Sequence, residues 1–172
     1  MESPGRFEEL ILPHTDAAYN LARWLTGNEH DAEDVTQEAM LRAFKFFGGF
    51  RGGNSRAWLL SIVRNTGYTW LEKNRKHDSA AARDEELGEI EDEAAGPDLQ
   101  MMKNATQQMI TEAMAELPME FREVTVLREL EDMPYKEIAD IAGVPIGTVM
   151  SRLARARKLL QQSLVKKLEG AQ

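Results

Sequence analysis

The segment that most constrains the fold is residues 135–160, YKEIADIAGVPIGTVMSRLARARKLL. Its apolar spacing predicts a short amphipathic helix, a tight turn that contains Pro145, and a longer second helix. Gly143 suits a turn position that requires a positive φ angle. Ala139, Gly143 and Val149 have the spacing of a helix-turn-helix, in which a small residue allows the two helices to touch.

The second of these helices has an apolar side and a basic side. Val149, Leu153 and Ala156 follow helical spacing, which predicts that this side packs on the domain. There is no acidic residue between Ile146 and Val165. Arginine binds guanine through two hydrogen bonds, and basic side chains hold phosphates, so this helix is a candidate for the DNA major groove. A solvated basic helix in an ordinary bundle is the alternative, but the helix-turn-helix spacing favours DNA binding. The candidate DNA contacts are Thr148, Ser151, Arg152, Arg155, Arg157 and Lys158.

The formal net charge of −8 is unusual for a DNA-binding protein, but it is concentrated in one segment. Residues 1–77 and residues 99–172 each carry 10 basic and 10 acidic side chains, whereas residues 78–98 carry one Arg and nine acidic residues. This segment has too few bulky apolar residues to fold alone. We therefore predict two modules, 1–77 and 99–172, joined by a flexible acidic linker over 78–98 that serves as a solvated tether.

Both modules show helical periodicity, and neither shows the alternation typical of strands. The sequence therefore predicts an all-α protein made of two small helical bundles. Pro13 should interrupt the first helix. Asp31, Ser55 and Asp98 are the expected N-caps of later helices.

Several classes of chemistry are excluded or disfavoured. The chain has no cysteine, which removes disulfides and thiolate metal sites, and it has no recognised hydrolase or nucleotide-binding motif. The acidic residues beside His30 suggest capping of a helix start rather than a metal site. We expect no cofactor, no metal and no enzymatic activity. The start of the chain is unlike a secretory signal and no apolar run could cross a bilayer, which favours a cytoplasmic protein without membrane insertion.

A second polar segment surrounds the loop FRGGNSR at residues 50–56. Trp58 and Trp70 lie on an apolar face and are better explained as core residues than as platforms for bases. The nearby polar side chains have no role in a hydrophobic core, and Asn offers both a hydrogen-bond donor and an acceptor to a base edge. The candidate contacts to unpaired DNA are Arg51, Asn54, Arg56, Arg64 and Asn65.

These motifs together resemble a known family. The sequences DAEDVTQEA from residue 31, FRG from residue 50 and WLLSIVRN from residue 58 resemble region 2 of bacterial sigma factors. The sequences ELP from residue 116, EIA from residue 137 and PIGTVMSRLARAR from residue 145 resemble region 4. An architecture limited to these two regions is similar to that of the extracytoplasmic-function (ECF) group.

The resemblance implies a transcription initiation factor. By resemblance, residues 1–77 bind core RNA polymerase and the minus-ten promoter element, and residues 99–172 bind the minus-thirty-five element and the β flap. The implied contacts to the β′ clamp helices are Asp34, Gln37, Glu38 and Arg42. The family also implies an anti-sigma factor as a partner. A free-standing helix-turn-helix regulator remains the alternative, although it leaves the motifs of the first module unexplained.

Overall fold

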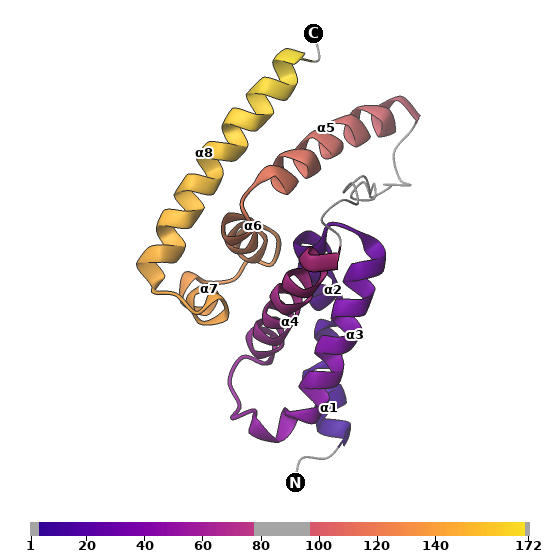
Figure 1. Cartoon of the computed structure of the whole chain (residues 1–172), viewed down its shortest axis with the longest axis vertical. Coiled ribbons are helices and arrows are strands. Elements are labelled where there is room, and N and C mark those ends of the chain that lie inside the picture. Colours follow the sequence, from indigo (N-terminus) through magenta and orange to yellow (C-terminus); the bar gives the residue numbers. More distant parts are fainter. Residues whose placement is uncertain (1–3, 78–96, 171–172) are drawn as a thin grey trace.

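The computed structural model describes residues 4–77 and 97–170, and every regular element in these ranges is helical (Figure 1). The prediction of an all-α protein is confirmed for this part of the chain. The acidic segment predicted as a tether falls almost entirely outside the described residues.

The first bundle contains the helices that precede that segment. It comprises α1 (Pro4–Leu10), η1 (Leu12–His14), α2 (Thr15–Thr26), α3 (Glu29–Lys45), η2 (Phe47–Gly49) and α4 (Ser55–His77). The predicted break at Pro13 is confirmed, because a 3-10 turn separates α1 from α2. Helices α2, α3 and α4 pack against one another. Gly67 allows α4 to approach α2 closely, since a Cβ atom there would lie 3.1 Å from the Leu25 side chain.

The helix starts differ from the predicted caps. The N-cap of α3 is Asn28 and not Asp31: the Asn28 side chain accepts a hydrogen bond from the Asp31 backbone N–H at 2.8 Å and donates one to the Asp31 carboxylate at 2.7 Å. The Asn28 side chain therefore satisfies one backbone donor that the helix itself leaves unpaired, and the Asp31 carboxylate accepts from the Asn28 amide group. The side chain of Asn54, not that of Ser55, accepts from the first turn of α4. Asp98 lies inside α5, which begins at Pro97.

The second bundle contains the helix-turn-helix. It comprises α5 (Pro97–Glu116), α6 (Met119–Thr125), the π-helical turn η3 (Val126–Leu130), α7 (Tyr135–Ala142) and α8 (Ile146–Gly170). Its interior includes Leu127, Ile138 and Leu153. Helical spacing alone places Ile110 and Leu130 in this core, but both are about half exposed (46% and 51%). The sequence pattern marks a helix face, whereas the neighbours available to that face depend on the tertiary structure.

The two bundles are in contact with each other. Helix α4 packs on α7, and α2 packs on α6. The guanidinium group of Arg122 on α6 donates to the backbone carbonyls of Met114, Ala115 and Leu117 at the end of α5. It also donates to the carbonyl of Trp24 in the last turn of α2, at 3.1 Å. One side chain therefore donates to carbonyl groups at the ends of helices in both bundles, where the last carbonyl groups have no backbone donor of their own.

We predict that Asn28→Ala lowers the free energy of unfolding of the first bundle by about 1 kcal/mol, because it removes the N-cap of α3. Chemical denaturation followed by circular dichroism measures the change. Asn28→Ser is the control, since serine retains an oxygen that accepts the same backbone hydrogen bond. Equal stability of the alanine and serine variants would contradict the assigned cap.

Candidate nucleic-acid interface

The helix-turn-helix has the geometry that its sequence predicts. Gly143 ends α7 with a φ of 70°, and the backbone N–H groups of Gly143 and Val144 both donate to the Ala139 carbonyl, at 2.9 and 3.1 Å. Ala139 and Val149 are both buried. The small residue, the left-handed turn and the apolar residue therefore fix the angle at which α8 leaves α7.

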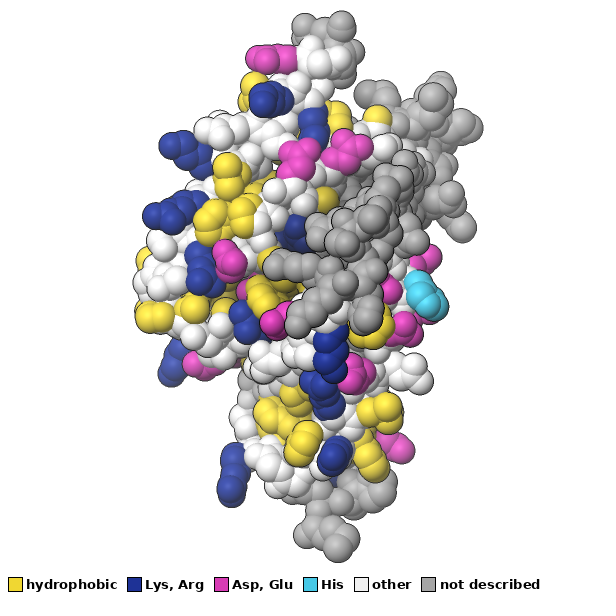
Figure 2. All heavy atoms as spheres, in the orientation of Figure 1, with side chains coloured by type: hydrophobic (Ala, Val, Ile, Leu, Met, Phe, Trp, Pro, Cys, Tyr) yellow, Lys and Arg dark blue, Asp and Glu magenta, His cyan; other side chains and the backbone are white. Residues whose placement is uncertain are grey.

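Helix α8 presents its basic side to the exterior. Val149, Leu153 and Ala156 are buried, as predicted, and Leu160 one turn further along is partly buried. Over its 25 residues the helix is about 37 Å long, and Lys and Arg side chains are visible along this side of the molecule (Figure 2). The six candidate contacts differ in exposure: Ser151, Arg155, Arg157 and Lys158 are exposed, whereas Thr148 and Arg152 are partly buried.

Arg157 differs from the other candidates because it is held by a neighbouring element. Its guanidinium group donates to Glu129 at 3.1 Å, which connects α8 to η3. This bond raises the pKa of Arg157. Arg152 and Arg155 have no ion pair among the described residues, so they are the stronger candidates for contact with DNA.

The loop at residues 50–56 of the first bundle is anchored by packed aromatic side chains, and its tip is exposed. Phe47, Phe50 and Trp58 pack together, with ring centroids 5.2 to 6.1 Å apart, so Trp58 is a packing residue as predicted. Gly52 and Gly53 have φ angles of 89° and 86°, which side chains other than glycine rarely adopt. Arg51 is exposed at this tip.

The other polar candidates of the first bundle lie on α4 or directly before it, and two of them donate hydrogen bonds to the second bundle. The side-chain amide of Asn54 donates to Glu137 of α7 at 2.6 Å. Arg64 donates to Glu123 of α6 at 2.5 Å, and Tyr68 donates to the other oxygen of this carboxylate at 2.6 Å. Burial and the neighbouring Glu123 raise the pKa of Tyr68, which keeps the phenol protonated.

Arg56 and Asn65 are the remaining candidate contacts to unpaired DNA. Burial raises the pKa of Glu131, and the Arg56 guanidinium partly offsets this effect, so these two groups interact electrostatically. Burial lowers the pKa of His14, and Arg56 lowers it further. Asn65 is exposed and accepts a hydrogen bond from Arg64 at 3.4 Å. The structure therefore brings Arg64 and Asn65 together and leaves Asn65 open to the exterior.

The predicted polymerase-binding residues lie along α3. Arg42 bonds to Glu38 and to Thr66, each at 3.3 Å, and His30 lies 3.9 Å from Asp34. Gln37 is exposed and borders a hollow of about 750 Å³. No group of acidic and histidine side chains in the described parts of the chain is arranged to hold a metal ion.

The sequence interpretation missed the apolar part of this surface. Leu12, Leu41 and Phe44 line the same hollow, and their side chains are 46%, 65% and 58% exposed. Leu41 and Phe44 follow Gln37 at helical spacings of four and seven, so the pattern that identified Gln37 also contains them. Contiguous exposed apolar side chains of this kind mark interaction surfaces.

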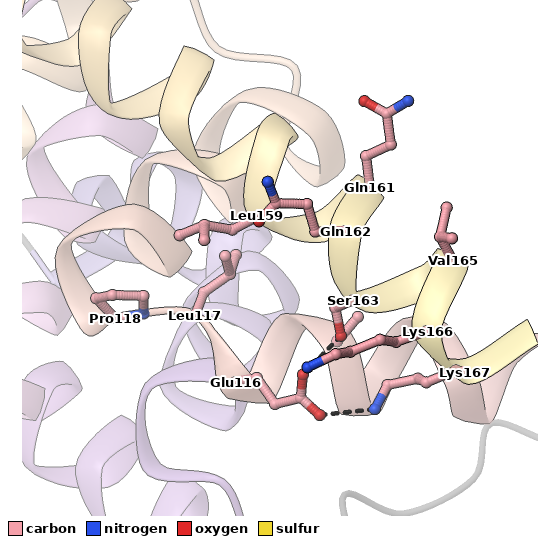
Figure 3. Close-up of a pocket in the computed structure, with 11 residues that line it drawn as sticks. Glu116, Leu117, Pro118, Leu159, Gln161, Gln162, Ser163, Val165, Lys166 and Lys167 are labelled. Atoms are coloured by element: carbon pink, nitrogen blue, oxygen red, sulfur yellow. Dashed lines mark hydrogen bonds and ion pairs between the residues drawn. The ribbon is translucent and has the colours of Figure 1, made fainter. Parts of the chain in front are cut away.

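A second hollow, of about 930 Å³, lies between the end of α5 and the last turns of α8 (Figure 3). Leu117, Leu159 and Val165 line it. At its edge, Glu116 accepts hydrogen bonds from Ser163 and Lys167, each at 2.6 Å. These bonds lower the pKa of Glu116 and raise that of Lys167, so the pair holds α5 and α8 together.

Comparison with known proteins agrees with this geometry. Residues 10–77 match the family model for sigma-70 region 2, and residues 107–160 match that for sigma-70 region 4. The ECF RNA polymerase sigma-E factor of Escherichia coli is 32% identical over 141 residues, which span 78% of this chain and 74% of that protein. The chain belongs to the ECF sigma factors.

Two further relatives define the extent of the similarity. The ECF sigma factor SigE of Mycolicibacterium smegmatis is 36% identical over 93% of this chain, which spans 62% of that protein's length. The sigma factor RpoE of Bartonella quintana, solved in complex with the anti-sigma factor NepR, has a TM-score of 0.75 and 27% identity, and the match covers 92% of this chain and 96% of RpoE. The similarity therefore includes both regions. No helix in the described parts of this sigma factor is long and apolar enough to span a membrane.

We predict that Arg152→Ala and Arg155→Ala each weaken holoenzyme binding to promoter DNA by about 1–3 kcal/mol if they contact bases. Lys158→Ala should have a smaller effect that depends mainly on salt, as a peripheral phosphate contact would. Filter binding across a range of salt concentrations separates these cases. If the Arg152/Arg155 double alanine variant keeps the promoter affinity of the unmodified protein, α8 is not the helix that contacts the promoter bases.

Proposed function

We propose that this sigma factor binds core RNA polymerase through α3, reads the minus-thirty-five element with α8, and opens the minus-ten element with the loop and outer face of α4. The observation that carries this proposal is the exposed basic face of α8 on a helix-turn-helix, in one chain with residues 10–77 that match sigma-70 region 2. A free-standing regulator would require only the helix-turn-helix and would leave the α3 surface without a use.

The two hollows support two separate contacts with polymerase. The hollow beside α3 combines apolar side chains with the polar Gln37, Glu33 and Asp16, which suits a helical partner with a mixed surface. We assign it to the β′ clamp helices. The hollow between α5 and α8 is mainly apolar with Lys166 and Lys167 at its border, and we assign it to the β flap.

We also propose an anti-sigma factor as a regulatory partner. The support is the similarity to RpoE over nearly the whole of both chains, since RpoE forms such a complex. In this proposal the sigma factor acts in the cytoplasm as a binding subunit, and the chemistry of transcription belongs to the polymerase.

Run-off transcription tests the proposal directly. Core polymerase and this protein are combined on templates carrying candidate promoters, and a transcript that requires both components is expected. Core polymerase alone and this protein alone are the controls. If core polymerase does not bind the protein, or binds it without gaining promoter-dependent initiation, the proposal is wrong.

We predict that Leu41→Gln weakens binding to core polymerase by about tenfold, because it removes the burial of one leucine side chain in the contact. Surface plasmon resonance with immobilised core enzyme measures the affinity. Phe46→Gln is the matched control, since Phe46 is also exposed (57%) but does not line the hollow. Equal affinities of the two variants would place the contact elsewhere on the first bundle.

We predict that Asn65→Ala slows formation of the open complex, because an exposed amide that reads an unpaired base is lost. Permanganate footprinting on a fully paired promoter should show reduced reactivity of thymines in the minus-ten element. A template with mismatched minus-ten bases should recover part of the activity, since the protein no longer has to drive unpairing. Normal melting by the variant would show that Asn65 is not in the base pocket.

A further inference from the structure

The outward side of α8 carries exposed apolar side chains close to its N-terminal end. Ile146 is 48% exposed and Met150 is 52% exposed. Ala154, four positions further on, is also exposed, and spacings of four place all three on one strip of the helix. The side of α8 that packs on the bundle is a different one, which contains Val149 and Leu153. The strip is therefore not part of the core.

The strip lies at the end of α8 where base contacts are expected. Ile146 is the first residue of α8 and follows directly after the turn of the helix-turn-helix. The backbone N–H groups of Thr148 and Val149 both donate to the Pro145 carbonyl, at 3.0 and 3.2 Å, so the helix is regular from its start. The N-terminal residues of a recognition helix are the ones that contact base edges in the major groove.

Met150 is the longest of the exposed side chains between Ile146 and Ala154. Gly147 and Ala154 lie about one turn before and one turn after it, and Ser151 is the next residue. A Cβ atom added at Gly147 would have no other atom within 4 Å, so the space beside Met150 is open to the exterior. Small neighbours allow the helix to come close to a partner, and the Met150 side chain then makes the first contact.

The charges around the strip favour nucleic acid over an apolar protein partner. Lys158 follows Ala154 by four positions and Arg155 is the residue after Ala154, and both basic side chains are exposed. No acidic residue lies between Ile146 and Val165. An apolar protein surface would remove water from these cations without pairing them. The phosphates that border a major groove would pair with them and leave the base edges to Met150.

The major groove offers one apolar group to such a side chain. Thymine presents a 5-methyl group there, whereas the other bases are identified by hydrogen-bond donors and acceptors. Met150 and Ile146 have no hydrogen-bond donor, and the thioether of methionine is only a weak acceptor. A cytosine in the same place would set its amino group against an apolar side chain and lose the water bound to it.

We propose that Met150, with Ile146 one turn before it, contacts the 5-methyl group of a thymine in the minus-thirty-five element and makes the sigma factor select thymine at that position. This inference rests on the proposed reading of this element by α8. The polar side chains Ser151 and Arg155 recognise hydrogen-bonding groups, which thymine and uracil share. Only an apolar contact distinguishes these two bases.

Selection from a DNA library tests the base preference. Holoenzyme assembled from core polymerase and this sigma factor is incubated with promoter duplexes whose minus-thirty-five positions are randomised, and the bound duplexes are sequenced. The unmodified protein should enrich thymine at a position where Met150→Ala does not. Leu168→Ala is the matched control and should retain the enrichment, since Leu168 is also exposed (57%) on α8 but lies about five turns beyond Met150.

Replacement of the selected thymidine by deoxyuridine isolates the methyl group, because every hydrogen-bonding group is retained. For the unmodified holoenzyme, this replacement should lower the affinity by about fourfold, the effect expected when one methyl group is lost from an apolar contact. Met150→Ala should bind the two duplexes equally. Met150→Leu should still distinguish them, since leucine retains the apolar contact. Alanine and leucine are both strong helix formers, so α8 should be preserved, and circular dichroism checks this.

The inference is overturned if the unmodified holoenzyme enriches no thymine, or if thymidine and deoxyuridine give equal affinities at every enriched position. It is also overturned if Met150→Ala retains the discrimination. Weaker binding of Met150→Ala to core polymerase, with unchanged selection of DNA, would assign the strip to a protein partner instead. The Arg152/Arg155 double alanine variant separates these outcomes from a failure of the proposed function, because it tests whether α8 contacts the promoter at all.

Discussion

The arrangement of the two bundles depends on a charged group that would be unfavourable alone. Glu123 has no exposed surface, and its carboxylate is acceptable in that position only because Arg64 and Tyr68 approach it from the other bundle. Such a contact adds little net stability compared with apolar packing, but it tolerates few alternative geometries because both oxygens must be satisfied. It therefore selects one relative placement of α4 and α6 from the many that apolar surfaces would allow.

The neighbouring residue on α6 has a complementary effect. Arg122 donates to carbonyl groups that terminate α5 and α2, so it fixes the start of α6 against helices from both bundles. Consecutive side chains on one short helix thus bind the first bundle through opposite charges. A helix of only seven residues has little stability of its own, and these contacts compensate for its length.

The surfaces that we assign to different partners differ in the polarity and charge of their side chains. The hollow beside α3 exposes leucine and phenylalanine, which suits a protein partner that excludes water. The outer face of α8 exposes arginine and lysine on a helix that carries no acidic residue before Glu169, which suits a phosphate backbone. The surface around Arg64 is different, because its donors are already satisfied by carboxylates within the chain.

Much of the fold and part of the candidate site could be predicted from the sequence. Apolar spacing determined that the chain is helical, Gly143 and Val149 determined the helix-turn-helix, and the basic run from Arg152 determined which face of α8 is polar. These features are local, since backbone geometry places residues that are three, four or seven positions apart on one side of a helix. The exposed Leu41 and Phe44 have the same local spacing as Gln37, but apolar side chains alone do not distinguish a binding surface from a core.

The tertiary structure decided the features that depend on distant partners. Asn28 rather than Asp31 caps α3 because the turn before the helix orients its side chain toward the Asp31 backbone N–H. Ile110 and Leu130 are exposed because none of the helices described in the structure covers them. Nothing in the sequence indicates that Arg64 meets Glu123, which is 59 positions away. The sequence by itself determined which side chains are donors and acceptors, and only the packing of the two bundles determined which donor meets which acceptor.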